Sequence, residues 1–360
     1  MLICLSSGSS PRYRHDVLMA LAMPEGTTLR FRYDLRWVTD QLESKIRASE
    51  KDSENKVEDT SSLIAYIDQR DTTKPPEIIP CRYTVLARVD LHGTTVSLDL
   101  TLKEFAHADD LFAFNQELGT LAAERLPKWD RTEAKPEIEG CYCFEIGQEP
   151  GTMVRSGDLK RWEEIVAQVT ERKDFKEEGC FYTVRGLYKV DSSARIGYGT
   201  RGFDLDPNDQ YELRIYNYHP EKTPKNTWLL LDLTSRWLTI TSNPLLSIDS
   251  RYDQKRVRFE TGRPWRDEEV LLSVYRIDGA NPQEAPRDFE FDLRSKIGKA
   301  TLHILGYLIV LAVALASPPI VQVWLDGDLS LLNQIIVTAV ALIGGFVVGL
   351  IAVFGLQRFP

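Results

Sequence analysis

The sequence has little cysteine and histidine, with five of each in 360 residues. The cysteines are odd in number and irregularly spaced, and no CxxC or Cys/His pair has zinc-finger spacing. Cys141 and Cys143 would share one face of a strand, a little far apart for an easy disulfide. The pattern argues against a disulfide framework or a zinc finger and predicts free thiols in a reducing compartment.

The sequence also lacks a basic excess and known catalytic motifs. Lys and Arg total 44 against 53 Asp and Glu, a formal net charge of -9, which is not typical of a nucleic-acid-binding protein. No GxSxG, HExxH, P-loop or HxE…CxxC motif occurs. We therefore expect no enzyme, no cofactor and no resident metal, while a catalytic site assembled from distant residues stays open.

A convincing secretory signal is absent as well. The segment "DVLMALAMPEG" (residues 16–26) has an apolar core of about seven residues, at the lower limit for a signal peptide. We interpret it as a strand that ends in a turn at Pro24–Gly26, followed by a second strand.

Two long uncharged stretches close the chain, within residues 300–357. Each exceeds the roughly 20 apolar residues that a helix needs to cross a bilayer, so the sequence predicts a transmembrane helical hairpin with spans at about 300–320 and 332–356. Basic residues flank the hairpin, whereas its turn carries Asp326 and Asp328. By the positive-inside rule we expect a two-pass protein of the cell inner (plasma) membrane with both termini cytoplasmic and the lipid bilayer as partner.

Small residues recur on one face of the second predicted span. Gly345 and Gly349 form a GxxxG pattern, which lets membrane helices approach closely. This predicts a helix-packing seam, which would serve either packing within the hairpin or a homo-oligomer. The seam consists of Thr338, Ala341, Gly345, Gly349 and Ala352.

The remaining chain is predicted to be mainly β (α+β). Period-two alternation in residues 81–102 predicts a β-hairpin, and helical spacing follows in residues 103–126. We thus expect an N-terminal β-rich domain over residues 1–126 with one helix and a mobile, polar loop at 48–62.

A second cytoplasmic domain is expected after a junction at residues 127–139. Short strands separated by Pro, Gly and Asn turns predict a β-sandwich or barrel-like domain over residues 140–295. One amphipathic helix interrupts these strands, "DLKRWEEIVAQVTERK" (residues 158–173). Its predicted buried face consists of Trp162, Ile165, Val166 and Val169.

Arginines alternate with aromatic residues near the N-terminus. Such alternation can hold phosphates and stack a base, which makes this region a candidate site for an anionic ligand. The alternative is an ordinary half-buried strand with arginine on one face. The candidate ligand-binding residues are Arg12, Arg14, Arg30, Arg32 and Arg36.

Two further motifs have weaker support. The "DLDPND" loop places Asp204, Asp206 and Asp209 where carboxylates could bind calcium, although an EF-hand pattern is missing and a simple turn is the alternative. "GYGTRG" (residues 197–202) has the spacing of a dinucleotide fingerprint, but it leads into a turn and a strand rather than a helix, so we interpret it as a loop.

The layout of a cytosolic module followed by two membrane helices resembles the membrane effectors of bacterial antiphage defence systems, in the order of parts and without a shared motif. In those systems a nucleotide second messenger or a sensor partner drives oligomerisation and membrane damage. The resemblance implies a membrane-anchored binding or sensing protein with a nucleotide or protein ligand, which acts through clustering of its hairpin. The alternatives are a membrane-tethered enzyme and an inner-leaflet scaffold for a protein complex.

Overall fold

The structure is a computed structural model of the whole chain. It describes residues 1–8, 10–51, 60–68, 77–125, 142–176, 179–199, 202–264, 266–285, 287–299, 330–331, 333–341 and 343–344. The chain divides into two compact units. Unit 1 comprises Met1–Leu205, Asp209–Thr261 and Glu269–Lys296, and unit 2 comprises Asp206–Asn208, Gly262–Glu268 and Ile297–Pro360. The junction expected at 127–139 and most of the loop expected at 48–62 lie outside the described residues.

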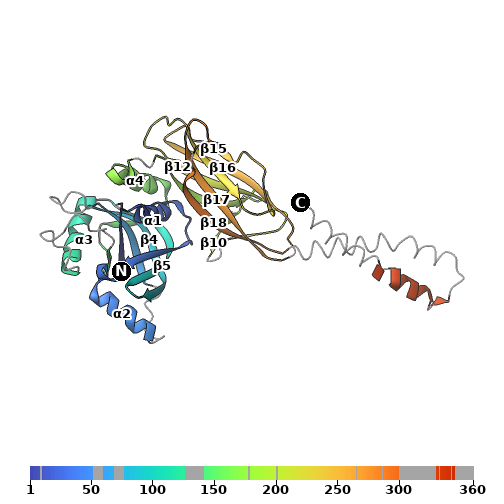
Figure 1. The fold of residues 1–360 in the computed structure, drawn as a ribbon, viewed down its shortest axis with the longest axis horizontal. Helices are drawn as coiled ribbons and strands as arrows, with labels where there is room; N and C mark the ends of the chain where they lie inside the picture. Colours follow the sequence, from blue (N-terminus) through green and yellow to red (C-terminus); the bar gives the residue numbers. More distant parts are fainter. Residues whose placement is uncertain are drawn as a thin grey trace. The chain divides into compact units, whose positions relative to one another are not determined.

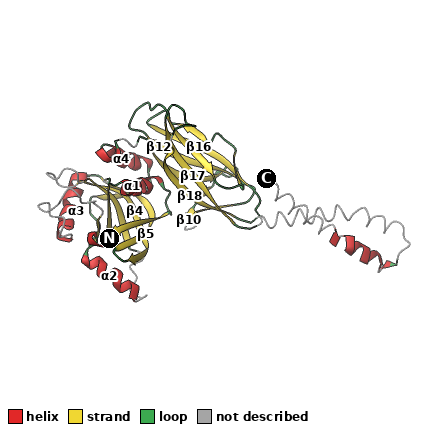
Figure 2. Ribbon diagram, viewed as in Figure 1, coloured by secondary structure: helices red, strands yellow, loops and turns green. Residues whose placement is uncertain are grey.

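Unit 1 begins with a seven-stranded sheet. Strands β4 and β5 of this sheet are labelled in Figures 1 and 2. Six strands follow the order β2-β5-β4-β3-β1-β6, and β7 pairs with β5. Only β1 and β3 pair in parallel; the other pairs described for this sheet are antiparallel. The strands are β1 (Leu2–Ser7), β2 (Thr28–Asp34), β3 (Ser61–Asp68), β4 (Glu77–His92), β5 (Thr95–Ala108), β6 (Tyr142–Glu145) and β7 (Met153–Ser156).

Helices cover both faces of this sheet. Phe114 and Leu118 of α3 (Leu111–Arg125) pack against one face. The other face is covered by α1 (Pro11–Ala22) and α4 (Leu159–Thr170), which share a core with Phe181 and Tyr218 of the following strands. A further helix, α2 (Asp40–Lys51), precedes β3. Because α1 belongs to a core that includes sandwich residues, it is held between the sheet and the sandwich.

The second part of unit 1 is a β-sandwich, as predicted. One sheet has the order β14-β16-β12-β8-β9 and the other β10-β11-β18-β17-β13-β15. The rings of Tyr182 and Phe291, one from each sheet, pack together in the core with their centroids 5.0 Å apart. The strands are β8 (Phe181–Lys189), β9 (Arg195–Ile196), β10 (Tyr198–Gly199), β11 (Gly202–Leu205), β12 (Gln210–Tyr218), β13 (Thr227–Leu233), β14 (Leu238–Ile240), β15 (Leu245–Ser247), β16 (Tyr252–Thr261), β17 (Glu268–Asp278) and β18 (Arg287–Ile297).

Several predicted elements are confirmed. The β4–β5 hairpin turns at Gly93, where φ is 61°. All four predicted inward residues of α4 are fully buried. The cysteines of the described part, Cys4, Cys81, Cys143 and Cys180, are free and buried.

The segment predicted as the first strand is instead helix α1. Pro11 stands at the start of the helix, where its fixed φ is favourable and its missing N–H costs nothing. Val17, Leu18 and Leu21 form its buried stripe. The prediction of a strand is wrong here because a short apolar run has the same appearance in a buried strand and in a buried helix.

The predicted transmembrane hairpin is wrong. Among the described residues, no helix combines the length and the apolar character needed to cross a membrane. In the second predicted span, residues 333–341 and 343–344 are described and helical, and the other residues of that span lie outside the described part of the chain. The first predicted span lies outside the described residues.

This correction extends to the predicted location. The two-pass topology in the inner membrane, with both termini cytoplasmic, rested on the hairpin and is corrected with it. Three further expectations lose the same basis: the bilayer as partner, clustering through the second span, and the likeness to two-helix defence effectors. Thr338 and Ala341 lie in the described helical residues, whereas Gly345, Gly349 and Ala352 lie outside them.

Candidate functional site

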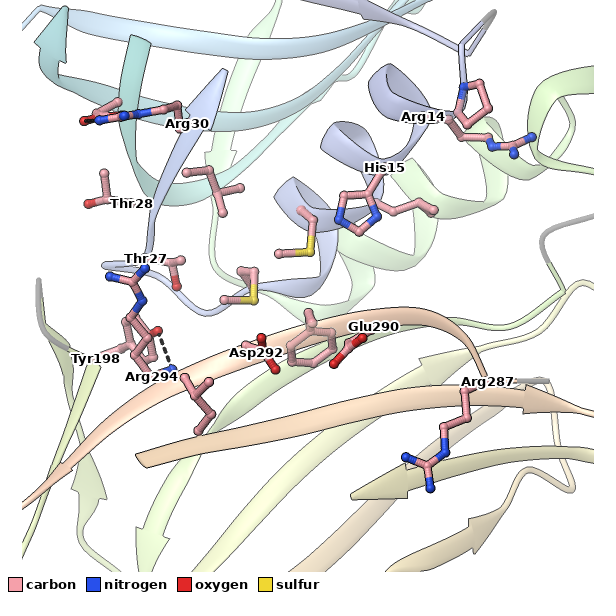
Figure 3. A pocket seen from close by; sticks show the side chains of 18 residues that line it. Arg14, His15, Thr27, Thr28, Arg30, Tyr198, Arg287, Glu290, Asp292 and Arg294 are labelled. Atoms are coloured by element: carbon pink, nitrogen blue, oxygen red, sulfur yellow. Dashed lines mark hydrogen bonds and ion pairs between the residues drawn. The ribbon is translucent and has the colours of Figure 1, made fainter. Parts of the chain in front are cut away.

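A cavity of about 1310 Å³ lies in unit 1, between α1, the start of β2 and the outer face of β18 (Figure 3). Its charged and hydroxyl-bearing lining residues are Arg14, His15, Thr27, Thr28, Arg30, Asp99, Tyr198, Arg287, Glu290, Asp292 and Arg294. Its apolar lining includes Leu18, Met19, Met23, Leu29, Leu271 and Phe291. The mixture of apolar surface with a few polar groups is typical of small-molecule sites.

Strand alternation places the charges of β18 on the cavity side. Phe291 and Leu293 are buried in the sandwich, so Glu290, Asp292 and Arg294 point the opposite way and are exposed. On the facing wall, His15 and Met19 are four residues apart in α1 and thus lie on one face of the helix. Figure 3 shows Glu290 and Asp292 beneath the helix that carries His15.

The two carboxylates of β18 are held by hydroxyl groups of the neighbouring strand β17. The Ser273 hydroxyl donates a hydrogen bond to Asp292. Tyr275 is hydrogen-bonded to Glu290, which raises the pKa of the tyrosine because the carboxylate disfavours a second negative charge. Each carboxylate can accept further hydrogen bonds, since it offers about four lone-pair sites.

Tyr198 connects β18 with the beginning of β2. Its hydroxyl accepts the backbone N–H of Arg294 at 3.2 Å and forms a side-chain hydrogen bond with Thr27. Burial raises the pKa of Tyr198, so the phenol stays protonated at neutral pH. This link fixes one end of the cavity (Figure 3).

The arginines of the cavity differ in how they are neutralised. Arg30 forms a two-point ion pair with its cross-strand neighbour Asp99, at 2.6 and 2.7 Å. Arg287, which also lines the cavity, pairs with Asp232 at 3.2 Å. For Arg294, by contrast, no ion pair of the guanidinium occurs within the described part of the chain.

A half-buried carboxyl lies next to the cavity on α1. Burial raises the pKa of Asp16 to about 7, and the opposing attraction of Arg12 and Arg32 does not offset it. Asp16 therefore changes charge near neutral pH.

The five arginines predicted to bind an anion are thus divided. Arg14 and Arg30 line the cavity, and Arg14 donates a hydrogen bond to the carbonyl of Asp174 at 3.3 Å. Arg12 and Arg32 are close enough to Asp16 to attract its carboxylate. Arg36 lies in the short 3-10 helix η1 (Leu35–Trp37).

The acidic "DLDPND" loop, a candidate calcium site by its sequence, has the features of a turn. Asn208 has a φ of 58°, which asparagine tolerates in turns. Asp209 forms an ion pair with Lys189 at 2.7 Å. Across the described ranges, no group of three or more acidic, histidine or cysteine side chains is arranged to hold a metal ion.

The "GYGTRG" segment contributes β10, β11 and close packing, not a helix start. Gly202 has a φ of +96°, and a Cβ there would lie 1.9 Å from the carbonyl oxygen of Arg294. The glycine therefore lets this segment pack directly on β18 beside the cavity.

Sequence reasoning missed His15, Tyr198, Glu290, Asp292 and Arg294. The alternation of charged and apolar residues in "FEFDLR" (residues 289–294) does predict an exposed charged strand face. Nothing in that pattern indicates that the face would lie opposite α1, which is more than 260 residues earlier.

Comparison with known proteins finds no protein family whose model matches this chain, and no curated protein with significant similarity to its sequence.

Proposed function

We propose that this chain is a binding protein rather than an enzyme, and that its cavity takes a nucleotide. The observation that carries the proposal is the row of charges on β18, where Arg294 has no ion pair among the described residues and stands beside Asp292 and Glu290. A nucleotide combines phosphates, which a guanidinium binds, with base amino groups, which a carboxylate accepts.

The size and lining of the cavity support the same ligand class. Its volume of about 1310 Å³ is ample for a molecule of nucleotide size. Met19, Met23 and Leu18 of the facing wall supply apolar surface against which a base could pack. Arg30 and Thr28, at the β2 end, add donors for a phosphate chain.

Isothermal titration of the full chain with ATP, CTP, UTP and adenosine tests this proposal. We expect the triphosphates to bind more tightly than adenosine. Arg294→Ala should weaken triphosphate binding by about ten-fold, the loss typical of one charge-assisted contact. Asp292→Asn should reduce the preference for CTP over UTP, because only cytosine offers an amino group at that position.

Arg236→Ala is the matched control. This exposed arginine lies over the Trp237 ring and does not line the cavity, so its loss should change affinity less than about two-fold. If the wild-type chain binds none of these compounds at millimolar concentration, or if Arg236→Ala and Arg294→Ala weaken binding equally, the proposal is wrong.

A further inference from the structure

The outer face of β8, β12 and β16 carries a cluster of arginines around one carboxylate. In the antiparallel register of β12 and β16, Glu212 pairs with Arg258 and Arg214 pairs with Arg256. Residues two apart on a strand share a face, so all four side chains lie on the same side of this sheet. We refer to these four residues as the arginine cluster.

The carboxylate at the centre is buried and the arginines around it are not. The side chain of Glu212 is 7% exposed, whereas those of Arg256 and Arg258 are 58% and 56% exposed. The Nε of Arg214 donates to Oε1 of Glu212 at 2.8 Å, and the Nε of Arg258 donates to Oε2 at 3.1 Å. Arg256 approaches Oε1 at 4.0 Å.

Glu212 is ionised in this setting. Burial alone raises the pKa of the carboxyl, but the hydrogen bonds from Arg214 and Arg258 and the charge of Arg256 bring it below its ordinary value. One negative charge thus faces three positive charges. The cluster keeps two positive charges that none of its own members neutralises.

The hydrogen bonds to Glu212 also orient the guanidinium groups. Each guanidinium has five N–H donors, and Glu212 uses the inner Nε–H of Arg214 and of Arg258. The terminal NH₂ groups are left for a ligand, in the fork arrangement that suits phosphate. Glu212 is therefore a positioning residue for the arginines.

Neighbouring residues extend the cluster on one side. The guanidinium of Arg214 lies 3.9 Å from the centre of the Tyr188 ring, which holds it by a cation–π contact. Next to it, Gly186 has a φ of +143°, and a Cβ there would lie 3.0 Å from the Nε of Arg195. The glycine therefore lets a fourth arginine lie close to the sheet beside Arg214.

We infer that the arginine cluster is a binding site for a compact anion with two or more linked phosphate groups. The guanidinium groups converge on one point rather than forming a stripe, and a chain of net charge -9 does not attract a long polyanion. The cluster shares no residue with the cavity, so the inference does not depend on the function proposed for that cavity.

Titration of the full chain with inorganic pyrophosphate tests the inference. Removing the two exposed arginines together (Arg256→Ala, Arg258→Ala) should weaken binding by about ten-fold or more, since two charge-assisted contacts are lost. The single Arg256→Glu variant, which reverses one exposed charge, should weaken it at least as much as Arg256→Ala. Thermal unfolding of each variant verifies that it is folded.

The matched control removes two exposed arginines elsewhere (Arg236→Ala, Arg266→Ala) and should change affinity less than about two-fold. Arg294→Ala should also leave pyrophosphate binding at the cluster intact. The inference fails if the wild type does not bind pyrophosphate at millimolar concentration, or if the control pair weakens binding as much as the cluster pair. It also fails if a single-stranded oligonucleotide binds far more tightly than pyrophosphate, because the surface would then be a nucleic-acid interface.

Discussion

In the N-terminal sheet, the buried guanidinium of Arg82 is surrounded by backbone and an aromatic ring, whereas in the sandwich the buried carboxylate of Glu212 is surrounded by arginine side chains. Arg82 donates to the carbonyl oxygens of Lys103 at 2.5 Å and Ala20 at 3.5 Å, and lies 4.0 Å from the centre of the Phe105 ring. Burial lowers its pKa to about 9, although Glu25 and Glu104 oppose the shift.

The two arrangements differ in the hydrogen-bond donors that remain available to a ligand. The carbonyl groups and the ring that satisfy Arg82 are internal, so the charge connects α1 to β5 and offers nothing to solvent. The arginines that satisfy Glu212 are themselves exposed and keep unused donors. We therefore expect changes at Arg82 to affect stability alone, and changes around Glu212 to affect stability and binding.

The largest effect is expected for Arg82→Ala. It leaves a cavity and at least one unsatisfied carbonyl in the core, so we expect the free energy of unfolding to fall by about 3–4 kcal/mol. Urea unfolding at pH 7 measures this value. Arg88→Ala, on the same strand but 63% exposed, should change stability very little, and equal losses in the two variants would contradict the role assigned to Arg82.

An intermediate effect is expected for Glu212→Gln. The variant removes the charge that holds three arginines together, so we expect a loss of about 2 kcal/mol at low salt, part of which 1 M NaCl restores by screening the arginines from one another. Urea unfolding at both salt concentrations measures this difference. Glu260→Gln, an exposed neighbour on β16, is the control. A loss that does not depend on salt would mean that packing, and not charge, explains the role of Glu212.

The smallest effect, and one of opposite sign, is expected for Asp16→Asn. The pKa of Asp16 is raised from near 4 in the unfolded chain to about 7 in the fold, so the native state holds the extra proton and the wild type loses stability as pH rises from about 4 to 7. The asparagine variant should lack this loss and be more stable by about 1–2 kcal/mol at pH 8, with little difference at pH 4. Thermal unfolding across that pH range measures it, and parallel curves for the two proteins would contradict the raised pKa.

The strands and helices could be predicted where one face of an element is solvated. The β4–β5 hairpin and α4 have clear periods of two and 3.6 residues because one side of each faces water. The predicted helix at 103–126 began too early, since β5 continues to Ala108. The last residues of β5 are buried on both faces, so the alternation of apolar and polar residues is lost there. For the same reason the apolar run of α1 did not reveal its helix.

The candidate sites were less predictable than the strands that carry them. The alternation of Arg256 and Arg258 is visible in "KRVRFET", but Glu212 lies more than 40 residues earlier. Their proximity follows from the register of β12 and β16.

By itself, the sequence determined the predominance of strands, the sandwich and the free thiols, because local alternation, turn residues and cysteine spacing act over a few neighbouring positions. Only the tertiary structure decided that α1 faces β18 across a cavity and that three arginines meet one buried glutamate. Within the described part of the chain the structure has no helix able to cross a membrane, which overturns the C-terminal hairpin predicted from hydrophobic length. Such juxtapositions depend on strand order and register, which arise from burial summed over the whole core.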